Sequence, residues 1–199
     1  MRPQQRSSFS DLLTATLAGI AVLDSAQLSR LEAHYRLLKR WNERMNLTSI
    51  RTLEEAVVRH YAESVFLATL LSAGSDILDF GSGAGFPGFP MAVFRPDWRL
   101  TLLESNQRKA VFLREATRSS PNITVLAQRG ERLKGHWDWF VSRAVRADDV
   151  VSAALRNARR IGLLIGAAEF GELAATVSWN PPVPLPWGDR RVAALGAVR

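Results

Sequence analysis

The glycine-rich stretch at residues 77–88 limits the folds open to this chain more than any other segment. It reads Ile-Leu-Asp-Phe-Gly-Ser-Gly-Ala-Gly-Phe-Pro-Gly, so a short apolar run leads directly into closely spaced glycines. A segment of helical character, residues 89–94, follows. This order is typical of a buried strand that turns sharply into a helix beneath a bound nucleotide or related cofactor. Glycine suits such a turn because the backbone takes positive φ and lies close to the ligand.

Two registers of the glycines point to different ligands. Gly83, Gly85 and Gly88 fit the dinucleotide spacing G-x-G-x-x-G. Gly81, Gly83 and Gly85 fit D-x-G-x-G-x-G, with Asp79 in the leading position. A carboxylate in this turn attracts S-adenosylmethionine, which carries an ammonium and a sulfonium, and repels a pyrophosphate. Asp79 therefore favours S-adenosylmethionine, and a dinucleotide-dependent oxidoreductase is the alternative.

Glu104 supplies a second signal, since it follows the next apolar run, residues 100–103. A carboxylate about 20 residues beyond the glycines is placed to accept hydrogen bonds from the two ribose hydroxyls of a nucleoside. Both candidate cofactors contain a ribose. Glu104 therefore supports a bound nucleoside without choosing between them.

The chain before the glycine stretch has helical periodicity. Residues 12–23 predict a short amphipathic helix rather than a secretory signal. Residues 25–45 predict a longer helix with a basic face, and Ser29 and Glu32 are a candidate capping box. Thr52 opens a further predicted helix that continues to residue 71. We therefore expect an N-terminal helical cap at residues 1–73, followed by a cofactor-binding α/β domain at residues 74–199.

Beyond residue 74, short apolar runs alternate with helical stretches, which indicates βαβ units and a parallel sheet. Strands are expected at residues 77–80, 100–104, 123–126, 139–142, 161–165, 176–179 and 192–195, with helices at 89–94, 107–118 and 148–158. The last two strands predict a closing antiparallel hairpin. The predicted fold is therefore a Rossmann-like, class I methyltransferase with a mostly parallel seven-stranded sheet.

The charge of the chain points to a polyanionic partner. The net charge of +7 and the pI near 10.9 suit nucleic acid more than an anionic membrane surface. The candidate phosphate contacts are basic residues of the cap and of one later helix: Arg40, Arg44, Arg51, Arg59, Arg108, Lys109, Arg114 and Arg118. Taken singly, each is also explained as solvated surface.

The sequence argues against a metal site and against a membrane span. The chain has no cysteine, and its three histidines have no metal-ligand spacing, so no metal site is predicted. No apolar run approaches the roughly 20 residues that a membrane span requires. We expect a cytoplasmic, monomeric protein without a membrane partner.

A series of short motifs, in one order, resembles the ribosomal small-subunit methyltransferase G family, also called glucose-inhibited division protein B. The motifs are Trp41-Asn42 with Asn46-Leu47-Thr48, Arg59-His60 with Ser64, Asp79 to Gly88, Leu102-Leu103-Glu104-Ser105, and Ser142-Arg143-Ala144. Where the family usually has aspartate, this chain has Glu63 and Glu104. The Lys-Gly often found after the fifth strand is here Ile165-Gly166, which leaves the substrate contacts of the last third open.

The resemblance implies methyl transfer from S-adenosylmethionine to N7 of a guanine in the 530 loop of 16S rRNA, with S-adenosylhomocysteine as product. It implies that Gly81 and Phe86 contact the cofactor, that Gly130 and Glu131 lie against the adenine, and that Glu104 binds the ribose. It also implies that Arg143 lies at the mouth of the site and contributes to cofactor binding. The implied partner is 16S rRNA or the small ribosomal subunit.

Guanine N7 has a lone pair and no proton, so no general base is required and catalysis is largely orientation. Arg143 is the candidate positioning residue, by donating to guanine O6 or to a phosphate. His60 is expected to line the RNA face or the mouth of the cofactor site, or to be a half-buried histidine with a hydrogen-bonding role. Trp41 is expected to join two helices. A methyltransferase for another RNA or a small molecule, and a non-catalytic ribosome-assembly module, are the alternative functions.

Overall fold

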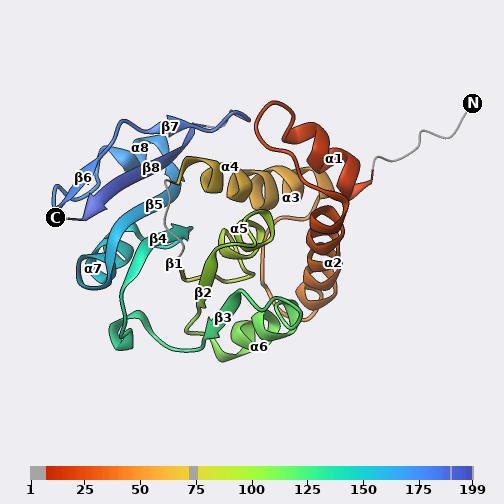
Figure 1. Cartoon of the computed structure of the whole chain (residues 1–199), viewed down its shortest axis with the longest axis horizontal. Coiled ribbons are helices and arrows are strands. Elements are labelled where there is room, and N and C mark those ends of the chain that lie inside the picture. Colours follow the sequence, from red (N-terminus) through yellow and green to blue (C-terminus); the bar gives the residue numbers. More distant parts are fainter. Residues whose placement is uncertain (1–7, 72–75, 189, 199) are drawn as a thin grey trace, which may run out of the picture.

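A single mixed sheet forms the centre of the molecule (Figure 1). The computed structural model describes residues 8–71, 76–188 and 190–198 of the 199-residue chain. The strands are β1 (Asp76–Phe80), β2 (Arg99–Leu103), β3 (Ile123–Leu126), β4 (Trp137–Arg143), β5 (Ala158–Gly166), β6 (Val177–Trp179), β7 (Val183–Pro184) and β8 (Arg191–Val198). Their order is β3-β2-β1-β4-β5-β8-β6, and the short β7 also pairs with β8.

The direction of the strands confirms the predicted sheet. β1 to β5 are parallel to one another, whereas β8 runs antiparallel to both β5 and β6. The expected C-terminal hairpin is therefore present, with β7 as an additional strand in its connection. Because β8 is antiparallel, its first residue lies beside Gly166, at the carboxyl end of β5.

Helices cover both faces of this sheet. They are α1 (Phe9–Thr16), α2 (Ser25–Asn42), α3 (Leu53–Ala56), η1 (Val57–Ala62), α4 (Glu63–Leu70), α5 (Gly88–Phe94), α6 (Gln107–Ala116), η2 (Gly130–Arg132), α7 (Ala147–Asn157) and α8 (Ala167–Phe170). Strand alternation sends neighbouring side chains to opposite layers. Ile77 packs with residues of α4 and α5, while Leu78 packs with residues of α7.

Several details of the predicted cap helices are wrong, and α1 covers Phe9–Thr16 instead of the expected residues 12–23. The capping box of α2 is formed by Asp24 and Gln27, so the helix begins before Ser29. The helix ends at Asn42, whose side-chain oxygen accepts hydrogen bonds from the Leu47 and Thr48 amides at 2.8 and 3.0 Å. The expected helix from Thr52 to residue 71 is divided into α3, the π-helical segment η1 and α4.

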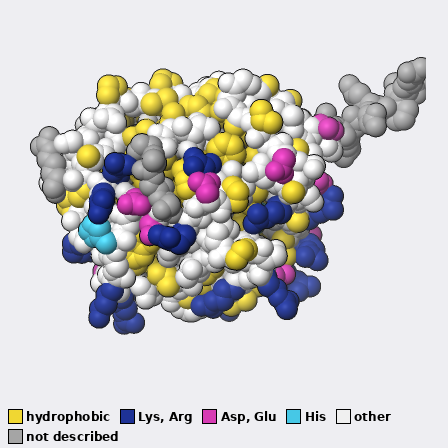
Figure 2. Space-filling view, viewed as in Figure 1, with side chains coloured by type: hydrophobic (Ala, Val, Ile, Leu, Met, Phe, Trp, Pro, Cys, Tyr) yellow, Lys and Arg dark blue, Asp and Glu magenta, His cyan; other side chains and the backbone are white. Residues whose placement is uncertain are grey.

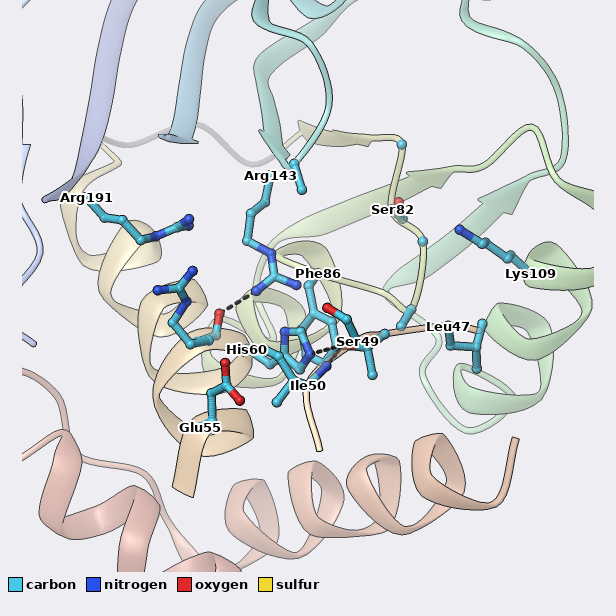
Figure 3. A pocket seen from close by; sticks show the side chains of 16 residues that line it. Leu47, Ser49, Ile50, Glu55, His60, Ser82, Phe86, Lys109, Arg143 and Arg191 are labelled. Carbon is cyan, nitrogen blue, oxygen red and sulfur yellow. Dashed lines mark hydrogen bonds between the residues drawn. The ribbon is translucent and has the colours of Figure 1, made fainter. Parts of the chain in front are cut away.

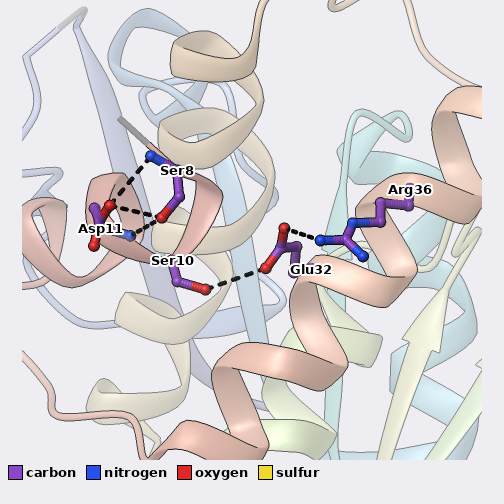
Figure 4. Close-up of polar contacts among 5 residues, drawn as sticks. All are labelled: Ser8, Ser10, Asp11, Glu32 and Arg36. Atoms are coloured by element: carbon purple, nitrogen blue, oxygen red, sulfur yellow. Dashed lines mark hydrogen bonds and ion pairs between the residues drawn. The ribbon is translucent and has the colours of Figure 1, made fainter. Parts of the chain in front are cut away.

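The N-terminal helices pack on the helices of one face of the sheet. Phe9, Leu31 and Tyr61 share a buried cluster with Phe89 and Phe112 of α5 and α6. Ser8 and Asp11 cap α1, and Ser10 donates to Glu32 of α2 at 3.4 Å (Figure 4). The predicted boundary between cap and α/β domain, at residues 73 and 74, lies outside the described residues.

Candidate functional site

A cavity of about 400 Å³, here called the main cavity, opens at the carboxyl ends of the parallel strands (Figure 3). Its walls come from residues 47–50 before α3, from η1, from the glycine loop between β1 and α5, and from the end of β4. In open α/β sheets, this edge is where ligands bind. Of the predicted site residues, Gly81, Gly83, Phe86, Arg59, His60 and Arg143 line the main cavity.

The glycine loop takes the backbone shape that the sequence predicted. Gly81, Gly83 and Gly85 have φ angles of +73°, +56° and +91°. A Cβ on Gly81 would lie 2.5 Å from Cγ2 of Val145, so close packing as well as positive φ requires glycine there. Gly88 has a different role, because a Cβ at this position would lie 2.4 Å from Leu102. Gly88 therefore permits α5 to pack tightly on the sheet.

His34 supports this loop from below, and no sequence motif had marked it as a site residue. It is 2% exposed, and its Nε2 lies 3.1 Å from the carbonyl oxygen of Ala84. Because a carbonyl only accepts, Nε2 carries the proton, and the Tyr61 hydroxyl donates to Nδ1 at 2.8 Å. Burial lowers the pKa of His34 to about 3, so the ring is neutral.

Asp79 lies beneath the glycine loop rather than on the cavity surface. Its side chain is fully buried, and Oδ2 accepts a hydrogen bond from the Gly88 amide at 2.9 Å. Oδ1 has no partner within the described part of the chain. Burial raises the pKa of Asp79 to about 7, although the Gly88 amide opposes this shift. Asp79 therefore lies behind the loop and does not line the main cavity.

Glu104 follows β2 and folds back against the same loop. Its Oε2 accepts from the Gly83 amide at 2.9 Å and its Oε1 accepts from the Asn106 amide at 2.7 Å. Each carboxylate oxygen has two lone pairs, so both retain capacity for a further donor. The glutamate is 7% exposed and is held in place by the backbone.

A second cavity, also of about 400 Å³, contains the other predicted cofactor residues. Gly130 and Glu131 line it together with Phe80, Ser105 and Val145. A Cβ on Gly130 would lie 2.5 Å from the Phe80 ring, so the η2 backbone packs directly on that ring. Val145, which lines this cavity, packs against Gly81, which lines the main cavity, so the two cavities lie on either side of this contact.

Arg143, Phe86 and His60 form a stack in the main cavity. The rings of His60 and Phe86 are nearly parallel with centroids 4.3 Å apart, and the Arg143 guanidinium lies 5.1 Å from the Phe86 centroid. Arg143 also donates to the carbonyl oxygen of Arg59. Burial lowers the pKa of Arg143 to about 10, so the group stays charged at neutral pH. The expected positioning arginine is therefore itself held by the glycine loop and by η1.

His60 is both buried and part of the cavity wall. It is 4% exposed, and its Nε2 lies 2.8 Å from Thr48 Oγ1. Its Nδ1 has no hydrogen-bond partner among the described residues. Burial, with the nearby charge of Arg143, lowers the pKa of His60 to about 2, so this ring is also neutral.

Glu63 connects Arg59 of η1 with Arg191 of β8. Its side chain is 3% exposed, with Oε2 at 3.0 Å from Arg191 Nη2 and Oε1 at 3.7 Å from Arg59 Nε. Burial raises the pKa of Glu63, and the charge of Arg191 opposes this shift. Sequence reasoning had noted Glu63 only as a departure from the family and had missed Arg191.

Other predicted RNA contacts lie outside the main cavity. Arg40, Arg44 and Arg108 line a groove of about 660 Å³, here called the α2–α6 groove, with Trp41 on its wall. Trp41 joins the two helices as expected, since it packs on Phe112 and donates to Glu115 at 3.2 Å. Arg51 is exposed in the loop before α3. In the part of the chain that the structure describes, no helix has the length and apolar character for a membrane crossing.

Comparison with known proteins relates this site to one family. Residues 27–168 match the model of a family described as rRNA small subunit methyltransferase G. The ribosomal RNA small subunit methyltransferase G of Neisseria gonorrhoeae is 38% identical over 170 residues, which cover 82% of this chain and 70% of that protein. The protein of the same name from Nitrosomonas europaea is 46% identical over 120 residues, which cover 58% of this chain and 56% of that protein. The chain thus spans little more than half the length of the Nitrosomonas relative.

Solved structures with low sequence identity share the fold. Magnesium protoporphyrin IX methyltransferase from Synechocystis, solved with bound S-adenosylmethionine, superposes with a TM-score of 0.60 at 14% identity. The superposition covers 90% of this chain and 99% of that protein. The predicted Rossmann-like methyltransferase fold is confirmed.

Proposed function

The chain belongs to the rRNA small subunit methyltransferase G family, and from this premise we propose that it methylates N7 of a guanine in the 530 loop of 16S rRNA. The methyl donor is S-adenosylmethionine. The observation that carries the proposal is the main cavity, which the glycine loop and the Arg143 guanidinium line together. In this proposal the methyl donor lies over the glycine loop and the guanine lies beside Arg143.

The two cavities together provide the cofactor site. We place the methionine part over Gly81 and Gly83, which line the main cavity, and the adenine against Gly130 and Glu131, which line the second. The ribose is proposed to lie at Glu104, which the Gly83 amide holds between the two. Gly85 and Asp79 contribute from behind the loop, the first through backbone shape and the second through its charge. When bound, S-adenosylmethionine supplies an electrophilic methyl group on a sulfonium.

The residues of the main cavity orient the guanine rather than remove a proton from it. N7 attacks with its lone pair, so the site needs alignment of N7 with the methyl carbon and sulfur. Arg143 donates to guanine O6, which leaves N7 free. Phe86 and the Arg59 carbonyl fix the position of this guanidinium. His60 is neutral and buried, so its contribution is the stacked wall under the guanine.

The basic groups outside the main cavity bind the RNA backbone. Arg40, Arg44 and Arg108 lie together in the α2–α6 groove, and Lys109 continues from Arg108 into the main cavity. Figure 2 shows Lys and Arg side chains gathered along the edge over α2 and α6. Arg51 extends this surface from the neighbouring loop. We propose that this surface follows phosphates of 16S rRNA, free or in the small subunit, and that a cytoplasmic monomer binds it.

The cofactor is tested by calorimetric titration with S-adenosylhomocysteine and, separately, with NAD. We expect binding of S-adenosylhomocysteine alone, weakened in the Glu104→Ala variant because the ribose loses its acceptor. Arg159→Ala, at the amino end of β5, is the control on the opposite edge of the sheet. Binding of NAD instead would establish the dinucleotide alternative and remove the basis of the proposal.

The RNA substrate is tested by transfer of a labelled methyl group to unmodified 16S rRNA and to small subunits prepared without this modification. A single N7-methylguanine in the 530 loop is expected, and its position is read by cleavage at the modified base. Arg40→Gln with Arg44→Gln should raise the KM for RNA and leave S-adenosylhomocysteine affinity unchanged. Methylation of small molecules, or none of any RNA, would contradict the assigned substrate.

A further inference from the structure

Arg191 reaches the main cavity from the other end of the sequence. It is the first residue of β8 and pairs in register with Gly166, so the antiparallel direction of β8 places it at the carboxyl edge of the sheet. Figure 3 shows Arg143 and Arg191 extending from different strands toward the same side of the cavity, away from Lys109. Two guanidinium groups therefore converge on one part of the wall.

Glu63 holds the guanidinium of Arg191 but accepts hydrogen bonds from only some of its N–H groups. Arg191 Nη2 donates to Glu63 Oε2 at 3.0 Å, whereas Arg191 Nε is buried and has no hydrogen-bond partner among the described residues. Each guanidinium carries five N–H donors, and buried donors are almost always paired in native structures. The unpaired Nε beside an open cavity indicates a missing acceptor.

We propose that Arg191 and Arg143 form a preformed anion site that holds a phosphate of the target nucleotide while its guanine is in the main cavity. The inference rests on the proposed function and adds a residue of β8 to the substrate side of the site. Glu63 fixes the guanidinium of Arg191 in this arrangement and leaves its Nε for a phosphate oxygen. Arg143 donates from β4, on the other side of β5, through N–H groups that guanine O6 and the Arg59 carbonyl leave free. Guanidinium groups bind phosphate with directed, charge-assisted hydrogen bonds.

A phosphate explains the position of the site better than the carboxylate of the cofactor's methionine. The Arg191 side chain is 19% exposed, so an anion at this rim keeps contact with solvent, as a phosphodiester does when only its base is inserted. In addition, Arg191 extends from β8 beside β5, whereas Glu104 follows β2, on the far side of β1. The ribose end of the cofactor and the anion site are thus separated across the sheet.

The test compares guanosine with guanosine bisphosphate, which carries a phosphate on each side of its ribose, as ligands of the protein saturated with S-adenosylhomocysteine. We expect the bisphosphate to bind about tenfold tighter or more, as charge-assisted hydrogen bonds predict. In Arg191→Gln this advantage should disappear while the affinity for S-adenosylhomocysteine is kept. Arg159→Gln is the matched control, with the same change at the exposed amino end of β5.

Because Arg191→Gln leaves the Glu63 carboxylate buried, the double variant Glu63→Gln with Arg191→Gln is measured as well, since it removes both charges of the pair. Equal binding of the two guanosine ligands to the unchanged protein, or a phosphate advantage that survives in both variants, would overturn the proposal. Loss of S-adenosylhomocysteine affinity in the variants would assign the site to the methionine carboxylate and also overturn it. If the unchanged protein does not bind S-adenosylhomocysteine, the proposed function fails. The comparison of guanosine with guanosine bisphosphate is then made without S-adenosylhomocysteine, and it still tests the anion site.

Discussion

The Nε2 atom of His34 donates to the carbonyl oxygen of Ala84 across 3.1 Å, so a side chain of α2 supports the glycine loop from its buried side. The ring also stacks on Phe89 of α5, with centroids 4.3 Å apart. The N-terminal helices are therefore part of the structure that shapes the loop. This relationship connects the stability of the cap with ligand binding.

Replacement of His34 should weaken ligand binding without changing the cavity wall. His34→Leu leaves the Ala84 carbonyl and the Tyr61 hydroxyl without partners, and we expect the free energy of unfolding to fall by about 1–3 kcal/mol. The affinity for S-adenosylhomocysteine should fall as well, because the loop is no longer held. Tyr61→Phe is the control, since it removes one hydrogen bond and leaves the Ala84 contact. Denaturant unfolding and calorimetry measure the two effects, and unchanged ligand affinity in His34→Leu would refute the support role.

Acid should destabilise the protein because two histidines are buried in the neutral form. Their pKa values are lowered to about 3 for His34 and about 2 for His60, against 6.5 for the unperturbed group. The unfolded chain therefore takes up protons that the folded chain does not as pH falls below 6.5. The free energy of unfolding should decrease by up to about 1.4 kcal/mol per pH unit for each histidine.

Urea unfolding at several pH values between neutral and mildly acidic measures this slope. It should be smaller in His34→Leu and in His60→Leu than in the unchanged protein. His136→Gln changes an exposed histidine and should leave the slope as it was. Equal slopes in all four proteins would show that other groups control the acid response.

The affinity for S-adenosylmethionine should depend on the ionisation of Asp79. Its pKa is raised to about 7 by burial, so near neutral pH both forms are populated. The carboxylate attracts the cationic donor, and affinity should therefore rise as pH increases through about 7. S-adenosylhomocysteine has no sulfonium charge and should show a weaker dependence.

Calorimetry with both compounds across this pH range provides the measurement. Asp79→Asn should remove the difference between them while the loop hydrogen bond is retained through the amide oxygen. The same raised pKa means that folding stability contributed by Asp79 falls as pH rises from its ordinary value of 3.8 to about 7. A pH dependence that persists in Asp79→Asn would assign the effect to another group.

Gly81 and Val145 should be energetically coupled. Gly81→Ala places a Cβ 2.5 Å from Val145 Cγ2 and forces a non-glycine residue to a φ of +73°. The left-handed conformation alone costs about 1–2 kcal/mol, and the close contact adds to this. Adding Val145→Ala to Gly81→Ala should recover only the free energy lost to the close contact, and not the cost of the left-handed conformation. A double-mutant cycle measured by denaturant unfolding separates the two, and a coupling energy near zero would show that the contact is relieved by movement of Val145.

Much of the fold could be predicted from the sequence because its signals are local. The alternation of short apolar runs with helical stretches gave seven strands in nearly the observed positions, and only the short β7 was not expected. The spacing of Gly81, Gly83 and Gly85 reflects the backbone geometry of one turn, which neighbouring residues dictate. The helix boundaries were less well predicted, since Asn42 ends α2 through hydrogen bonds to a loop that follows it.

The candidate site was predicted only in part, because some of its contacts depend on packing between segments that are distant in the sequence. Gly130 and Arg143 were expected from the family resemblance, and both line cavities at the expected edge. The surroundings of Asp79 did not follow, because a carboxylate in a turn faces a ligand or the core depending on how α5 packs. In the structure Gly88 permits close packing of α5, and Asp79 turns inward to its amide.

The sequence by itself determined the glycine turn, the order of strands and helices and the family, since each depends on residues close together in the chain. The tertiary structure alone decided which distant groups meet. His34 contacts a loop 50 residues away, and Arg191 pairs with Glu63 across 128 residues. These pairings depend on the docking of the N-terminal helices and on the antiparallel insertion of β8 beside β5. Such packing depends on the whole folded core, so no local pattern of residues predicts it.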